Sequence, residues 1–439
     1  MHQSFIALRH RNFRLLWVGL LFSFTGSLMQ SAAILWHVSL LVSPDRKGLA
    51  LGLVGLVRVI PIIVFSMISG VVADAWDRRK LMLFTQTAAA LVALTLALLT
   101  SRGLHAVWVL YALSALGSSV GAFDLPARQA LVPMLVPREH LPNAISLNTI
   151  MVQAASIAGP GLGGLLIASA GLSWVYLLNA LSFGCVIVAL LMMTGSAGAV
   201  ERQAVPGDPG PETARDVSWR SAVEGLRFVF QSPLIRSTML LDFFATFFSS
   251  AVALLPIYAQ DILFVGAQGY GWLYAAPAAG AVVMSAAMVF LTDRIERRGP
   301  ILLWAVAAYG LATVGFGLSR SFWLSFACLA LTGVADTVSM VIRSVVRQLE
   351  TPDRLRGRAT GINMVFFMGG PQLGELEAGA VAQWLGATFS VVSGGVGCLL
   401  VTAWVAATTP QLRNYRSAPV VPSPALAHAP TQDEPSTSA

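Results

Sequence analysis

Charged residues are scarce in this chain of 439 residues, since Asp, Glu, Lys and Arg together make up only 11% of it. An average soluble domain has about 25%. Residues of the hydrophobic set make up 56% of the chain. Such a small number of charges cannot cover a water-facing surface. The composition therefore excludes a soluble enzyme and indicates that lipid is the main solvent.

Lysine and cysteine are also nearly absent. Lys47 and Lys80 are the only lysines, so arginine supplies most of the cations behind the net charge of +7. This skew indicates a high-GC genome and no nucleic-acid partner. The three cysteines each lie alone in an apolar run, which excludes a disulfide framework and a cysteine-based metal site.

Sequence patterns of catalysis are missing as well. Neither lysine follows a GxxxxGK[ST] pattern, which excludes ATP hydrolysis within this chain, and no HExxH motif or histidine cluster indicates a metal centre. Gly159-x-Gly161-x-x-Gly164 matches a dinucleotide-binding pattern, but no strand precedes it. The sequence therefore predicts no enzyme and no cofactor.

Long apolar runs fill most of the chain. Crossing a hydrocarbon core takes about 20 apolar residues as a helix, and the alternation typical of a membrane β-barrel is absent. Cutting the chain at its turn residues predicts an all-α membrane protein with twelve transmembrane helices, at 13–42, 49–73, 81–100, 105–125, 144–168, 173–194, 236–260, 269–292, 300–318, 320–342, 359–384 and 387–408.

Arginines gather in alternate loops of this topology. Arg9, Arg11 and Arg14 lie before or at the start of the first span, and Arg78 and Arg79 follow the second, whereas the loops of the other set hold few cations. By the positive-inside rule, this bias predicts a multi-pass protein of the cell inner membrane with both termini in the cytoplasm.

The composition also changes between the predicted bundles and after the last span. The intervening segment is rich in Gly, Ala and Pro, and the spacing of Trp219, Val223, Leu226 and Phe230 within it predicts an amphipathic helix on the membrane surface. The predicted parts are a cytoplasmic N-terminus at 1–12, a six-helix bundle at 13–194, a linker at 195–235, a second six-helix bundle at 236–408 and a disordered cytoplasmic tail at 409–439.

Motifs of the first half recur in the second. Residues 74–79 are matched by residues 293–298, and Gly121-x-x-Asp124 is matched by Gly333-x-x-Asp336. Repeats of six helices predict two bundles related by a pseudo-two-fold axis, with a substrate path between them.

Two motifs carry a family resemblance. Gly70-x-x-x-Asp74-x-x-Asp77-Arg78-Arg79 resembles the loop signature between the second and third helices of the major facilitator superfamily, although Asp77 stands where the family usually has glycine. Gly159-Pro160-x-x-Gly163-Gly164 resembles its antiporter motif. The segments 9–14 and 370–375 are most similar to its branch of enterobactin exporters and macrolide-efflux proteins. The resemblance implies proton antiport and export.

Each motif also has a physical interpretation. Asp74 lies beside Arg78 and Arg79 at a helix end, where charge contacts can hold one conformational state and release the other. The repeat gives the same candidate role to Asp293, Arg297 and Arg298. The alternative is that these cations only follow the topology rule. Pro160 should interrupt the hydrogen-bond ladder of its helix, and the adjacent glycines should let another helix approach closely.

Ionisable side chains inside the spans are the strongest functional candidates, because each costs about 2.5 to 3.5 kcal/mol unless it is buried and paired. Asp124 and Asp336 have structural alternatives as partners of Arg128 and Arg343. Asp242 is a candidate for proton coupling. The full set of candidates for coupling or substrate binding is Arg58, Asp124, Asp242, Asp336, Glu375 and Glu377.

Arg58 and Glu375 lie at similar depths in the second and eleventh spans, which face each other in the family that the chain resembles. We therefore predict an ion pair between them, with Glu377 less suited because it points about 200° away around its helix.

These observations predict a secondary transporter, acting as a monomer in the lipid bilayer, that exports a small amphipathic molecule, siderophore or drug-like, in exchange for protons. An importer of a small metabolite with the same fold is the first alternative, and a non-transporting receptor or channel is the second. Phe243, Phe244, Phe247 and Met340 would suit an aromatic cargo, but they would equally suit contact with lipid.

Overall fold

The computed structural model describes residues 5–194, 227, 229–291 and 295–416. Most of the predicted amphipathic helix, most of the predicted disordered tail and Asp293 lie outside the described residues. Within them the chain is helical, as the sequence predicts. The first residues of the tail are wrongly predicted as disordered, because Pro410–Arg413 form a short helix.

Six long helices form the first half of the chain. They are α1 (Arg11–Leu41), α2 (Lys47–Ala75), α3 (Arg78–Ser101), α4 (Val107–Leu131), α5 (Leu141–Ser169) and α6 (Leu172–Met192). A short 3₁₀ helix, η1 (Ile6–Arg9), precedes them.

The second half repeats this arrangement with one difference. Its helices are α8 (Pro233–Phe248), α10 (Gly266–Leu291), α11 (Arg298–Leu318), α12 (Phe322–Glu350), α13 (Asp353–Leu385) and α14 (Ala387–Thr408), followed by the short α15 (Pro410–Arg413). The seventh predicted span is broken after Phe248 and continues through η6 (Ala251–Leu254), α9 (Leu255–Ile257) and a π-helical turn, η7 (Tyr258–Ile262).

All twelve predicted spans are thus present as helices. Eleven segments of the described residues are long and apolar enough to cross a membrane, when α8 to η7 is taken as one, and α13 is the twelfth helix. The largest errors in the boundaries fall on α4, α12 and α13, which extend beyond the predicted ends into segments that carry charge. A charge ends a hydrophobic run but not a helix, because Arg and Glu are good helix formers.

Local sequence explains several helix ends. Asp77 caps α3, since its side chain accepts hydrogen bonds from the backbone N–H groups of Arg79, at 2.9 Å, and Lys80, at 3.1 Å. Gly171 and Gly386, with φ of +90° and +89°, form the tight turns between α5 and α6 and between α13 and α14. Only glycine adopts that backbone conformation without strain.

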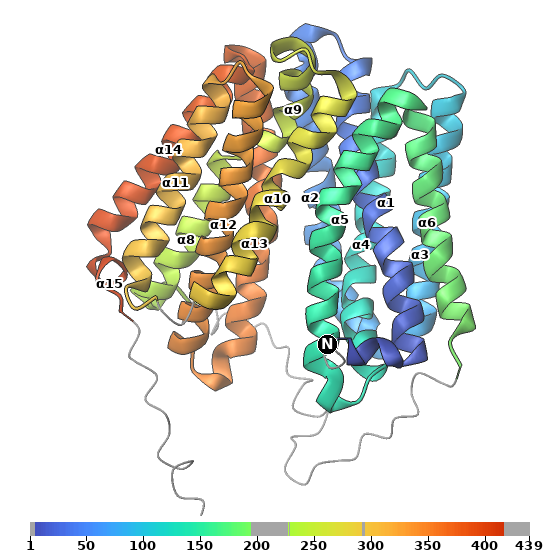
Figure 1. Cartoon of the computed structure of the whole chain (residues 1–439), viewed down its shortest axis with the longest axis horizontal. Helices are drawn as coiled ribbons and strands as arrows, with labels where there is room; N and C mark the ends of the chain where they lie inside the picture. The colour runs from blue at the N-terminus through green and yellow to red at the C-terminus, as the bar shows by residue number, and fades with distance from the viewer. Residues whose placement is uncertain (1–4, 195–226, 228, 292–294, 417–439) are drawn as a thin grey trace, which may run out of the picture.

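The helices form two bundles, α1–α6 and α8–α14 (Figure 1). Figure 1 shows the chain entering α1 at the lower end of the molecule, where α15 also lies. We call this the basic end, because Arg11, Arg78, Arg298 and Arg413 begin or end helices there. The opposite, far end holds the short turns between α1 and α2, α5 and α6, and α13 and α14. Across the two bundles α2 packs against α13, and α5 packs against α10.

Candidate transport site

Glycines bring the two bundles into backbone contact in the half of the molecule toward the far end. A Cβ added to Gly52 of α2 would lie 3.0 Å from the Glu375 carbonyl oxygen of α13, and one added to Gly48 would lie 2.7 Å from the Gln383 backbone nitrogen. A Cβ on Gly164 of α5 would lie 2.7 Å from Gly271 Cα of α10. Because such distances leave no room for a side chain, the far half of the bundle interface is closed.

The antiporter-like motif supplies part of this packing. Gly159 and Gly163 lie against α1, where an added Cβ would be 2.8 Å from Leu28 Cβ and 3.4 Å from Met29 Cα respectively. Gly164 and the Pro160 carbonyl oxygen face Gly271. The predicted close approach of helices is therefore present. Pro160 has no backbone N–H, so one bond of the ladder is missing, yet α5 continues through it from Leu141 to Ser169.

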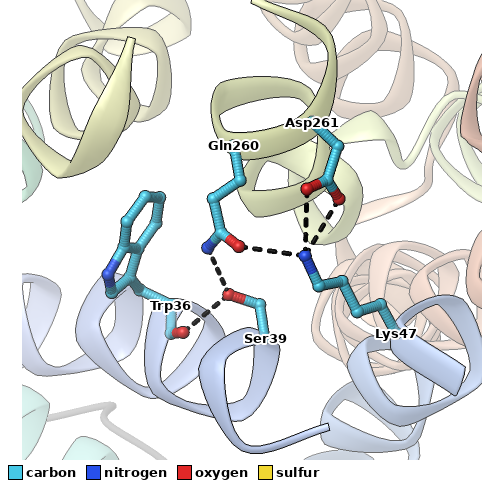
Figure 2. A network of polar contacts seen from close by, with 5 residues as sticks. All are labelled: Trp36, Ser39, Lys47, Gln260 and Asp261. Carbon is cyan, nitrogen blue, oxygen red and sulfur yellow. Dashed lines mark hydrogen bonds and ion pairs between the residues drawn. The ribbon is translucent and has the colours of Figure 1, made fainter. Parts of the chain in front are cut away.

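A polar network closes the far end above these crossings (Figure 2). Lys47 Nζ at the start of α2 donates to Asp261 Oδ2 of η7 at 2.9 Å and to Gln260 Oε1 at 3.1 Å. Gln260 Nε2 donates to Ser39 Oγ of α1 at 2.7 Å, and Ser39 donates to the Trp36 carbonyl oxygen. The Lys47 side chain is 9% exposed and that of Asp261 45%. This half-buried network links both bundles.

A cavity of about 400 Å³ lies among the helices of the first bundle. It reaches from Arg128, one turn from the basic end of α4, to Ile34 and Arg58. Its polar lining comprises Ser23, Ser27, Gln30, Ser31, Arg58, Thr85, Gln86, Ser114, Ser118, Asp124, Arg128, Asn179 and, from α13, Gln372. The aromatic residues Phe243, Phe244 and Phe247 and Met340, considered for a cargo site from sequence, do not line it.

Asp124 lies in this cavity wall with its charge compensated. Its carboxylate pairs with Arg128 and accepts hydrogen bonds from Thr85 Oγ1 and Gln86 Nε2, each at 2.8 Å. The Arg128 guanidinium also lies over the Phe24 ring, 4.3 Å from its centroid. The structural alternative for Asp124, a pair with Arg128, is thus formed.

Asp242 and Asp336 lie in the second bundle and share one cation. Arg343 Nη1 of α12 pairs with Asp242 Oδ1 of α8, and Arg343 Nη2 lies 3.7 Å from Asp336 Oδ1. The side chains of Asp242 and Arg343 are each 7% exposed, and that of Asp336 is 47% exposed. Asp336 lines a smaller cavity of about 110 Å³. The sequence identifies both acids as candidates but does not predict that they contact the same arginine.

Arg58 and Glu375 face each other only loosely. A Cβ on Gly55, one turn before Arg58, would lie 2.8 Å from Glu375 Oε2, so α2 and α13 do meet here as predicted. Arg58 acts electrostatically on Glu375, but the predicted ion pair is not among those that the described residues form. Arg58 lines the cavity instead. Glu377 likewise forms no ion pair within the described part of the chain.

The loop signature is placed at the basic end. Asp74 lies in the last turn of α2, but its side chain lies outside the described residues. Asp77 caps α3, which gives a local reason for an acid where the family usually has glycine. Arg79 Nη2 donates to the Leu191 carbonyl oxygen of α6 at 3.4 Å. In the repeat, Arg297 precedes α11 and Arg298 begins it, and Gly70 has open space beside it.

Sequence reasoning missed most of the cavity and the far-end network. Ser23, Ser27, Gln30 and Ser31 recur at helical spacing in the first span and mark one polar face of α1, so this pattern could have been found. Lys47 falls in the predicted loop between the first two spans, and Asp261 directly follows the predicted seventh span, so neither stands out as an intramembrane charge. Their contact joins residues 214 positions apart, which no local pattern predicts.

Comparison with known proteins supports this architecture. Among solved structures, a bacterial homologue of the human lysosomal transporter Spinster matches 93% of this chain and 99% of its own, with a TM-score of 0.72 and 14% identity. The nucleoside transporter NupG matches 95% of this chain and 100% of its own, with a TM-score of 0.68 and 12% identity. These likenesses show a shared fold.

Sequence comparison narrows the relationship. Enterobactin exporter EntS of Escherichia coli O1:K1 is 28% identical over 387 residues, which cover 88% of this chain and 86% of the relative. EntS of strain O127:H6 matches to the same extent. The family model described as transmembrane secretion effector matches residues 2–435. The chain is therefore a multi-pass membrane transporter that belongs to the transmembrane secretion effector family of the major facilitator superfamily.

Proposed function

We propose that this chain exports an amphipathic small molecule from the cytoplasm by alternating access, in exchange for protons. The observation that carries the proposal is the polar cavity, which extends toward the basic end while the far half of the bundle interface is closed by glycine contacts. A cavity accessible from one side is what a carrier needs, whereas a channel needs a continuous path.

The direction rests on the position of the arginines. The helices begin and end with Arg11, Arg78, Arg298 and Arg413 at one end, and cations of this kind remain in the cytoplasm. The cavity would then be open to the cytoplasm and ready to accept cargo for export. This orientation puts both termini in the cytoplasm and makes the far-end network the outer gate.

The cavity lining suggests how cargo is held. Gln30 and Asn179 hydrogen-bond each other at 2.8 Å, so each can exchange this bond for one to a cargo. Arg58 is the cation of the lining that no described carboxylate pairs with, whereas Arg128 is neutralised by Asp124. All of the lining residues except Gln372 come from the first bundle, and Gln372 comes from the second. One chain therefore forms the complete site, and we propose that the protein acts as a monomer.

The motif residues would act in the transition between states. Separation of the bundles at the far end has to part Gly164 from Gly271 and Lys47 from Asp261. At the basic end, Asp74 with Arg78 and Arg79, and Asp293 with Arg297 and Arg298, would form contacts when that end closes. The 28% identity to an enterobactin exporter makes a siderophore the first cargo to test and a macrolide the second.

The test uses purified protein in proteoliposomes. We expect saturable counterflow of enterobactin or, failing that, of erythromycin, and accumulation that is driven by a proton gradient directed opposite to the cargo. Arg58→Gln should lower counterflow at least severalfold, and Arg46→Gln, at an exposed position in the turn between α1 and α2, serves as the matched control.

Three results would contradict the proposal. Flux that rises linearly with cargo concentration would indicate a channel. Binding of cargo without flux would indicate a receptor. Accumulation driven by a proton gradient in the same direction as the cargo would indicate an importer.

A further inference from the structure

Glu375 is a membrane-embedded acid at the closed interface between the bundles. It lies on α13 one turn from Gln372, at the crossing with α2 where both helices are in backbone contact. A Cβ on Gly55 of α2 would lie 2.7 Å from the Gln372 carbonyl oxygen and 2.8 Å from Glu375 Oε2. The Oε2 atom therefore lies between two helices that have to separate when the far end opens.

One oxygen of this carboxyl group lacks the partner that a buried anion needs. Its Oε2 atom is buried and has no hydrogen-bond partner, and none of the ion pairs of the described residues includes it. An ionised carboxylate held without partners in a low-dielectric environment is strongly unfavourable, and such a group takes up a proton instead.

The charged and titratable groups around Glu375 do not supply that partner. Arg58 of α2 lines the cavity and acts on Glu375 electrostatically, but it forms none of the ion pairs of the described residues. Tyr270 and Tyr274 of α10 also lie within electrostatic range of Glu375. Tyr270 donates its hydroxyl to the Ala32 carbonyl oxygen at 2.8 Å. Glu377, on the same helix, would add charge of the same sign.

We propose that Glu375 is the binding site of the coupling proton, and that the far end closes only when the proton is bound. This inference rests on the proposed alternation of the two bundles and identifies the carboxylate that couples it to protons. With the far end open, Glu375 Oε2 meets water and binds a proton from it. Closure then buries the neutral acid between α2 and α13, where Glu375 Oε2 lies in this structure.

The return of the proton follows the same geometry. Gln372 lines the cavity one turn away from Glu375, so the cavity provides a nearby water-accessible space toward the basic end. Loss of the proton there leaves an anion in the closed interface, which favours separation of α2 from α13 and reopening of the far end. Each cycle thus moves one proton from the far side to the basic side.

The experiment measures far-end opening without any cargo. Spin labels are attached at Trp108→Cys of α4 and Phe264→Cys, which follows η7, in protein whose three native cysteines are replaced by serine. Both positions are exposed, with 71% and 79% of their surface accessible. Pulsed electron–electron double resonance then gives the distance between the two spin labels, and so between the bundles at the far end, as a function of pH.

We expect the wild-type distance to be short at acid pH and to lengthen as the pH rises. Glu375→Gln, which mimics the protonated acid, should keep the distance short at every pH and abolish the pH-dependent lengthening. Glu377→Gln is the matched control and should keep the wild-type profile. A Glu375→Gln profile like that of the wild type would overturn the proposal, as would closure by added Na⁺ at fixed alkaline pH, which would identify a metal cation as the ligand.

A second measurement needs no substitution. Infrared difference spectra of the wild-type protein should show the carbonyl band of a protonated carboxyl group that grows with the closed population. Absence of this band in the closed population would also overturn the proposal. Failure of enterobactin and erythromycin counterflow would reject the proposed cargoes and leave both results standing, so the two inferences are tested separately.

Discussion

The two bundles carry a carboxylate at matching positions of their internal repeat, at Asp124 and Asp336, but surround it differently. Asp124 has its own arginine and two neutral hydrogen-bond donors. Asp336 lies 3.7 Å from Arg343, and Arg343 also pairs more closely with Asp242. In the first bundle the acid of the cluster has its own arginine, whereas in the second bundle two acids share one arginine. The repeat thus conserves the acidic residue but not its electrostatic environment.

The neighbouring glycines differ in the same way. Gly121, one turn before Asp124, lines the large cavity and has no atom within 4 Å of an added Cβ. Gly333, one turn before Asp336, packs against the Pro277 backbone of α10. The first bundle therefore has a cavity of about 400 Å³ where the second has one of about 110 Å³. This difference suggests that the first bundle provides the space for cargo, and that the second provides a packed support.

Arg343→Gln should have the largest effect of the substitutions that test this comparison. It would leave Asp242 and Asp336 without the arginine that pairs with them, and removing one partner of a buried pair costs about 3–5 kcal/mol. We expect a marked loss of monodisperse protein after heating in detergent, measured by size-exclusion chromatography. Arg347→Gln, one turn on, is the control, and equal losses for both would mean that the shared cation has no special role.

Gly333→Ala and Gly121→Ala form a matched pair with the next largest effect. The added methyl group should destabilise the second bundle at Gly333 by about 1–3 kcal/mol through overpacking against Pro277. At Gly121 it should leave stability unchanged but weaken cargo binding, because it enters the cavity. Thermal unfolding and counterflow separate the two effects. Equal destabilisation by both variants would contradict the difference in packing.

Arg128→Gln should cost less than Arg343→Gln, about 2 kcal/mol, because Asp124 would keep its bonds to Thr85 and Gln86. The melting temperatures of the two variants, measured in the same detergent, check this order. A larger loss for Arg128→Gln would mean that the two neutral donors contribute nothing.

Asp336→Asn should have the smallest effect on stability, within about 0.5 kcal/mol, because the contact with Arg343 is long and half of the side chain is exposed. Asp242→Asn should be clearly more destabilising, since it removes the close pair. Melting temperatures of both variants test this, and a reversed order would assign Arg343 to Asp336 instead.

Much of the fold could be predicted from the sequence. Apolar runs and arginine positions give the twelve helices because lipid imposes length and charge rules on every span. The break at Ser249 and the π turn at Tyr258–Ile262 could not be predicted, because they depend on packing against distant helices. Gly164 could be recognised as a packing residue, but its partner Gly271 comes from the other bundle.

The candidate site was predicted in part. Single ionisable residues such as Arg58, Asp242 and Glu375 stand out against an apolar background, so the sequence named them. Their pairing depends on rotation and depth of whole helices to within a few ångströms, which a sequence does not specify. The prediction that α2 faces α13 is therefore correct, but the predicted ion pair between Arg58 and Glu375 is not formed.

The π turn that carries Gln260 and Asp261 has a mechanical consequence. Its hydrogen bond from Leu263 N–H to the Tyr258 carbonyl oxygen, at 2.8 Å, spans five residues, one more than in an α-helix. A shift of this bond by one residue would rotate Asp261 by about 100° around the helix axis. Such a change in hydrogen-bond register would carry the carboxylate away from Lys47 without breaking α8 or α10. The far end would thus have a local means of releasing its ion pair at the cost of a single rearranged turn.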